Sequence, residues 1–80
     1  MNMIWVTDAK YLNGYTMKLK FNDGCWRTFD FSKMFGTHPM YEKIRDLNVF
    51  KQFSLNGWAV SWLNDTVDVA PEYLYENSIA

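Results

Sequence analysis

The strongest constraint on the fold is a strict alternation of apolar and polar side chains over residues 15–22. The apolar positions are Tyr15, Met17, Leu19 and Phe21. Successive side chains of a β-strand point to opposite faces, so this period of two predicts a strand with one buried face. The turn sequence Asn22-Asp23-Gly24 follows and leads into a second apolar-rich stretch at residues 25–31. The pattern therefore predicts an antiparallel β-hairpin.

The register of this hairpin follows from keeping one apolar face. A three-residue loop with Gly24 in the left-handed conformation pairs Met17 with Phe29, whereas a two-residue loop splits the apolar faces. We therefore expect the three-residue loop. This register turns Arg27 inward beside Leu19, which requires its guanidinium to reach past the edge of the sheet.

The remaining elements are predicted from turn residues, helix-start residues and apolar spacing. In chain order they are a strand at Met3–Val6, a turn at Asn13-Gly14, a short helix at Pro39–Asp46 and a helical turn around Asn48–Phe50 capped by Asp46. Strands at Phe53–Leu55 and Trp58–Trp62 follow, joined by a tight Asn56-Gly57 turn, and then come a turn at residues 64–66, a short stretch at Val67–Val69 and a helix from Pro71. The expected fold is α+β in a single small domain spanning residues 1–80: an antiparallel three-stranded meander, a short helix, a second β-hairpin and a C-terminal helix.

The predicted core is rich in aromatic side chains, as an 80-residue chain with 4 Trp, 5 Tyr and 6 Phe allows. It comprises Val6, Met17, Leu19, Phe21, Phe29, Phe31, Ile44, Phe50, Phe53, Leu55, Val60, Trp62 and Leu74. One cysteine cannot form an internal disulfide, which indicates a reducing, cytoplasmic compartment. No apolar run approaches the ~20 residues of a membrane span, so no membrane partner is expected.

Several motifs resemble those of one bacterial family, DUF2442, a domain of unknown function. The "F-S-D-G … V-D-L-S" signature of the family resembles Phe21-Asn22-Asp23-Gly24 followed by Phe29-Asp30-Phe31-Ser32. Its central helix resembles Tyr41–Asp46 with Phe50. Its closing motif resembles Trp62, Asp68 and Ala70-Pro71-Glu72 with Leu74-Tyr75. The family usually has glycine where this chain has Asp65-Thr66. The resemblance implies a small bacterial α+β domain with no established activity, in a gene context that suggests regulation or toxin–antitoxin pairing.

Candidate catalytic and metal-binding groups are few. Cys25 and His38 are each single in the chain, and a nucleophilic pair would need both in one cleft. A metal site with oxygen ligands would have to use Asp65, Asp68 and Glu72. The presence of these acids is explained more simply by their positions in turns and at the start of a helix. Phosphate-binding loops and nucleophile elbows are missing from the sequence. We therefore expect no enzyme activity and no cofactor.

Two aspartates match the family signature at corresponding places. Asp30 and Asp68 each precede an apolar residue and a predicted helix. We expect each to anchor the turn into its helix by accepting backbone N–H bonds, rather than to act as a catalytic carboxylate.

The candidate interaction surface combines basic and aromatic residues: Trp5, Lys18, Lys20, Trp26 and Arg27. The predicted register puts Trp26 opposite Lys20, where a cation–π contact can form. All 8 Lys and Arg lie in residues 1–51, and residues 52–80 carry only acidic charges.

These features favour a non-enzymatic protein-interaction or regulatory module, antitoxin-like, whose partner is another small bacterial protein or a second copy. The alternative is a nucleic-acid-associated regulator that uses the first hairpin, although a pI near 5.6 argues against direct nucleic-acid binding. A small-ligand sensor is a third class, without residues to support it.

Overall fold

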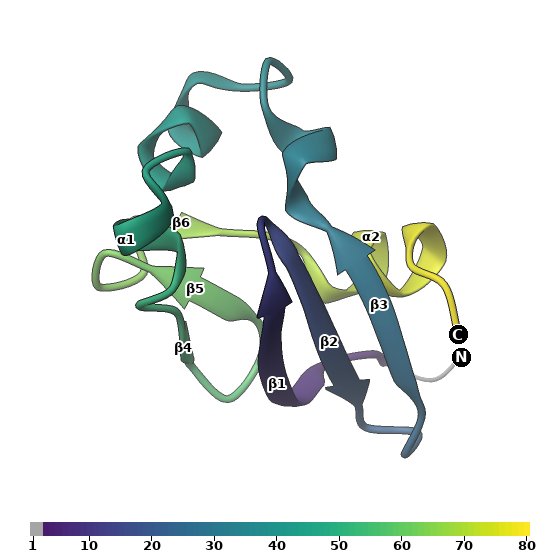
Figure 1. The fold of residues 1–80 in the computed structure, drawn as a ribbon. Coiled ribbons are helices and arrows are strands. Elements are labelled where there is room, and N and C mark those ends of the chain that lie inside the picture. The colour runs from purple at the N-terminus through teal and green to yellow at the C-terminus, as the bar shows by residue number, and fades with distance from the viewer. Residues whose placement is uncertain (1–2) are drawn as a thin grey trace.

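The first half of the chain forms an antiparallel sheet. The computed structural model describes residues 3–80 and orders the strands β1 (Val6–Asn13), β2 (Thr16–Phe21) and β3 (Trp26–Asp30) as β1-β2-β3 (Figure 1). Met17 pairs with Phe29 and Leu19 with Arg27, and Gly24 has φ of +86°, so the predicted three-residue loop and its register are confirmed.

β1 is longer than the strand expected at Met3–Val6, and it starts where that strand was expected to end. Register shifts lie between Val6 and Asp8 and between Tyr11 and Asn13. Each shift places one extra residue on β1, which is how a β-bulge restores the in/out order that the sequence breaks. As a result Ala9 and Tyr11 face inward.

Short helices connect the two sheets. They are the 3-10 helices η1 (Phe31–Met34) and η2 (Pro39–Ile44) and the helical turn α1 (Leu47–Phe50). The short helix predicted at Pro39–Asp46 is present over Pro39–Ile44, and it is a 3-10 helix, because Tyr41 N donates to the His38 carbonyl and Arg45 N to that of Glu42, three residues back. A six-residue run between Pro39 and the next cap is too short to offset α-helix nucleation, and 3-10 geometry is usual in such pieces.

The second sheet is small and follows the order β4 (Ser54–Leu55), β5 (Val60–Trp62) and β6 (Val67–Asp68). Leu55 pairs with Val60, so the chain turns at Asn56-Gly57 as predicted, in a four-residue loop where Asn56 Oδ1 accepts the N–H groups of Trp58 and Ala59. In the next loop Leu63, Asn64 and Asp65 have φ of 55°, 53° and 66°. Asp65 therefore has a left-handed conformation, which glycine adopts without strain. This fits the glycine that the resembled family usually has at this turn.

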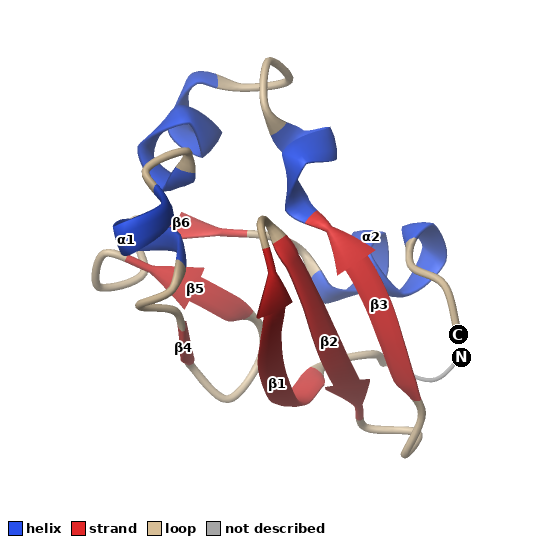
Figure 2. Cartoon of the chain, viewed as in Figure 1, coloured by secondary structure: helices blue, strands red, loops and turns tan. Residues whose placement is uncertain are grey.

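The C-terminal helix α2 (Pro71–Asn77) packs behind the first sheet, as Figures 1 and 2 show. Phe21 and Phe29 meet Tyr75 and Tyr73 edge to face at 5.0 and 6.1 Å between ring centroids. Ile79 then pairs with Thr28, so the chain after α2 covers the free edge of β3. The predicted α+β architecture is therefore confirmed, including the helix that starts at Pro71.

Aromatic rings dominate the core. Phe31, Phe50 and Trp62 are fully buried and pack with centroid distances of 5.4–5.6 Å, and Trp62 Nε1 donates to the Phe50 carbonyl at 2.8 Å. Leu55, predicted in the core, is 37% exposed, and Phe53 is only partly buried. β4 is two residues long and begins after Phe53, so the alternation expected over residues 53–55 is not sustained against the core. Met34, Ala59, Val67 and Val69 are buried instead.

Within residues 3–80, the longest helices fall far short of the length and apolarity that a membrane crossing requires.

Candidate interaction surfaces

The outer face of the first sheet carries the lysines of the predicted surface. Lys18 and Lys20 of β2 point to this face, and the register adds Lys10 of β1 directly opposite Lys18. Trp26 of β3 stands opposite Lys20. Figure 1 looks onto this face, with α2 on the far side of the sheet. The contribution of Lys10 depends on the bulge near Thr7, which sequence alternation alone could not locate.

The Trp26 ring contacts two ammonium groups, and neither belongs to the lysine expected. Lys18 Nζ lies 5.4 Å and Lys10 Nζ 5.5 Å from the ring centroid. The predicted pair with Lys20 is wrong. A side chain lying across a twisted sheet meets its diagonal neighbours, and here the indole reaches over β2 toward β1. We call Lys10, Lys18, Lys20 and Trp26 the lysine–tryptophan face.

Arg27 does not share this face. Its side chain is half-buried on the inner side, where Nε donates to Ser78 Oγ and Nη2 to the Ser78 carbonyl, both at 2.8 Å. The guanidinium also lies 4.8 Å from the centroid of the Tyr75 ring. The inward-pointing guanidinium of Arg27 is therefore stabilised by contacts with Ser78 and Tyr75 at the end of α2, and Arg27 is a structural residue.

Two residues of the family motifs meet across the molecule. Tyr75 Oη donates to Asp23 Oδ2 at 2.6 Å, although the residues are 52 positions apart. This bond holds the pKa of the Asp23 carboxyl below its ordinary value and raises the pKa of Tyr75. Asp23 Oδ1 also accepts from Cys25 N, and so stabilises the β2–β3 turn.

Several other residues of the motifs cap helices or are buried in the core. Asp30 caps η1 through the N–H of Ser32, and Asp46 caps α1 through that of Asn48, both at 2.9 Å. The expected anchoring role of Asp68 is wrong: it lies exposed in β6, and the residue before α2 is Ala70, with no side-chain cap. Pro71 starts α2 with its φ already suited to a helix, which reduces the need for a cap. The remaining motif residues are the buried Trp62, Pro71 and Leu74 and the exposed Glu72 in the first turn of α2.

Trp5 belongs to a different surface, together with Trp58. The two rings stack with centroids 6.2 Å apart and an interplanar angle of 15°. Trp58 is 38% exposed and Trp5 is half-buried. Exposed Met3 and Leu55 lie in the same two segments. We call the stacked rings the tryptophan pair.

The backbone around the tryptophan pair is fixed by hydrogen bonds. Val6 N donates to the Trp58 carbonyl at 2.9 Å, and Trp5 N donates to Asn22 Oδ1 at 2.9 Å. Asn22 N donates in return to the Trp5 carbonyl. These bonds join the start of β1, the β2–β3 turn and the β4–β5 loop. The two rings are therefore presented by a rigid scaffold.

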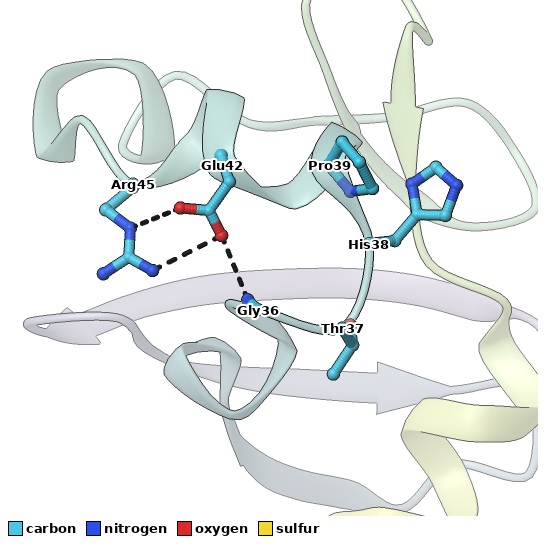
Figure 3. Close-up of a pocket in the computed structure, with 6 residues that line it drawn as sticks. All are labelled: Gly36, Thr37, His38, Pro39, Glu42 and Arg45. Carbon is cyan, nitrogen blue, oxygen red and sulfur yellow. Dashed lines mark hydrogen bonds and ion pairs between the residues drawn. The ribbon is translucent and has the colours of Figure 1, made fainter.

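An open hollow of about 420 Å³ lies between η1 and η2 (Figure 3). Its lining residues are Gly36, Thr37, His38, Pro39, Glu42 and Arg45. Arg45 donates to Glu42 through Nε at 2.8 Å and Nη2 at 3.3 Å, and Gly36 N donates to the same carboxylate at 3.0 Å. These bonds lower the pKa of Glu42, the one with Arg45 most strongly. In Figure 3 the His38 ring points away from this ion pair.

The candidate catalytic and metal residues are not brought together. Cys25 follows the β2–β3 turn and His38 precedes η2, in segments at opposite ends of the first sheet in Figure 1. His38 Nδ1 accepts from Met40 N and so caps η2. In the part of the chain from Met3 onward, three or more His, Cys, Asp or Glu side chains nowhere gather as a metal site would require, and this includes Asp65, Asp68 and Glu72.

Comparison with known sequences gives one match. Residues 6–80 match the profile of a family described as a protein of unknown function, DUF2442. Neither a curated protein nor a solved structure matches the chain.

Proposed function

The chain belongs to the DUF2442 family, and we propose that it is a non-enzymatic protein-interaction module in the cytoplasm, an antitoxin-like regulatory partner of another small bacterial protein. The tryptophan pair is the observation that carries this proposal. Tryptophan is strongly enriched among residues that dominate binding energy at protein interfaces. A ring that is 38% exposed in a chain of 80 residues leaves apolar area for a partner to bury.

The fixed backbone of the tryptophan pair supports this role. Binding costs free energy whenever side chains and loops must be ordered on association. Here three segments already hold Trp5 and Trp58 in place through the bonds of Val6 and Asn22. A partner that contacts the stacked rings therefore loses little affinity to ordering this surface.

The arrangement of titratable groups supports a non-enzymatic role. Glu42 and Arg45 neutralise each other beside the hollow of Figure 3, and His38 uses its Nδ1 as a helix cap. A general base or nucleophile needs a positioned partner within hydrogen-bond reach of a substrate atom. Neither Glu42 nor His38 is placed in this way.

The test is co-purification with the product of the adjacent gene. The two proteins are co-expressed and run on size-exclusion chromatography at micromolar concentration, and the expected result is one peak containing both chains. Trp58→Ala is expected to weaken the complex about thirtyfold or more, because hot-spot truncations cost at least ~2 kcal/mol. Leu12→Ala is the matched control, since Leu12 is also exposed (46%) but lies at the β1–β2 turn.

Separate elution of the two wild-type proteins would contradict the proposal. Equal weakening by Trp58→Ala and Leu12→Ala would show that the tryptophan pair is not the interface. A chain that elutes as a dimer on its own, and loses the dimer with Trp58→Ala, would assign the surface to a second copy.

A further inference from the structure

The lysine–tryptophan face carries three lysines, and the two acids on the same side of the sheet, Asp8 opposite Lys20 and Asp30 opposite Thr16, each accept a backbone N–H bond. Lys10 and Lys18 stand directly opposite each other on β1 and β2, an arrangement that destabilises a sheet through like-charge repulsion. Within residues 3–80 the ion pair of Glu42 and Arg45 lies elsewhere, and the lysines of this face form none. Asp8, the nearest acid in the register, turns its Oδ1 to the N–H of Ala9.

The fold separates this face from the acidic half of the chain. Helix α2, which carries Glu72 and Glu76, packs on the inner side of the first sheet, behind the face seen in Figure 1. Asp65 and Asp68 lie in and after the loop that leads to β6. Local potential, and not net charge, attracts a charged ligand to one side of a protein. The low pI of the whole chain therefore does not describe this face.

The lysine–tryptophan face also contains an aromatic ring, that of Trp26, among its lysines. Trp26 is half-buried and lies across the strands, with ammonium groups of two other strands at 5.4 and 5.5 Å. Neighbouring lysines are spaced by strand geometry, about 5 Å across strands and about 6.6 Å along β2. Proteins that bind single-stranded nucleic acid combine the same groups, with bases stacked on aromatic rings and phosphates on cations.

We propose that the lysine–tryptophan face binds single-stranded nucleic acid, with a base on Trp26 and phosphates on Lys10, Lys18 and Lys20. An acidic peptide would contact the lysines alone, whereas a base can also stack on Trp26 once phosphates draw the ammonium groups of Lys10 and Lys18 away from its ring, so the ring favours a nucleic acid. The lysine–tryptophan face is distinct from the tryptophan pair. A result for or against nucleic-acid binding therefore does not decide the proposed protein interaction.

The test is fluorescence anisotropy with a labelled oligothymidine of about 15 nucleotides. Three phosphate contacts predict a log–log salt slope of about −2, since single strands contribute about 0.7 per phosphate. Lys10→Gln and Lys18→Gln are each expected to reduce the slope by about 0.7. Lys43→Gln is the matched control, because Lys43 is an exposed lysine of η2, away from this face.

The stacking role has its own variant. Trp26→Leu is expected to weaken binding about tenfold while leaving the salt slope unchanged, because stacking on one aromatic ring contributes to affinity without neutralising a phosphate. Circular dichroism establishes that the variant is folded. The lysine variants, which change exposed side chains, test the face even if Trp26→Leu unfolds.

Three results would overturn the proposal. One is the absence of any anisotropy change at about 50 mM salt, where phosphate contacts are strongest. Another is an equal loss of binding with Lys43→Gln. The last is equal or tighter binding of a labelled polyglutamate, which would assign the face to an acidic protein segment.

Discussion

Arg27 shows how a charged side chain is accommodated on the inner face of a small sheet. The alternation of β3 correctly predicts that it points inward, opposite Leu19. Its partners, Ser78 and Tyr75, lie about fifty residues later, and no local pattern could indicate them. The sequence thus predicts the direction of the side chain but not the contacts that make this direction favourable.

Replacing Arg27 tests its structural role. We expect Arg27→Met to lower the free energy of unfolding by about 1–3 kcal/mol, because hydrogen-bonding groups of Ser78 lose their partner. Urea unfolding measures the change. Lys18→Met, on the opposite face of the same sheet, is expected to change stability by less than about 0.5 kcal/mol. Equal effects of the two substitutions would contradict the assignment of Arg27.

In the short helices, capping residues predict where a helix starts but not which type of helix forms. Asp30, His38 and Asp46 each accept a backbone N–H at the start of a helix, a role that aspartate favours and histidine does not. The type of helix is not predictable in this way, because η1 and η2 satisfy the same caps with 3-10 geometry. Asp68 also ends a strand, as Asp30 does, but Val69 and Ala70 separate it from the next helix, whereas Asp30 directly precedes η1.

A pair of substitutions separates a capping aspartate from a non-capping one. Asp46→Ala is expected to destabilise the fold by about 1 kcal/mol, the usual cost of removing an N-cap. Asp68→Ala is expected to stay within about 0.5 kcal/mol of the parent, as exposed substitutions do. Thermal unfolding of both variants makes the comparison. A larger loss for Asp68→Ala would mean that its carboxylate stabilises the fold in a way that the structure does not show.

At the scale of the molecule, two carboxylates join separate segments of the chain. Asp23 bonds to Tyr75 on α2, and Glu42 joins η2 to Gly36 and Arg45. In both cases the hydrogen bond to the ionised carboxyl lowers its pKa. Asp23 is recognisable in the sequence as a motif residue, but no local pattern indicates the distant Tyr75 hydroxyl that gives this residue its role.

These lowered pKa values predict acid sensitivity. The carboxyls bind protons less readily in the folded chain, so their stabilisation is complete above their ordinary pKa values of 3.8 and 4.5 and is lost as the pH falls through the lower folded values. The melting temperature is expected to fall below about pH 4.5. The variant Asp23→Asn/Glu42→Gln should be less stable at neutral pH and less sensitive to acid. An unchanged acid dependence in this variant would contradict the assignment.

The pairing of Thr28 with Ile79 sets an order of events during synthesis. Hairpins of β1, β2 and β3 join neighbouring segments and can form as soon as those residues emerge from the ribosome. The outer edge of β3 stays uncovered until residue 79 has been made, because its partner comes from the far end of the chain. An open strand edge recruits other strands, so the nascent chain passes through a stage at which it is prone to aggregate. Synthesis of Ile79 is therefore the step that protects the outer edge of the first sheet.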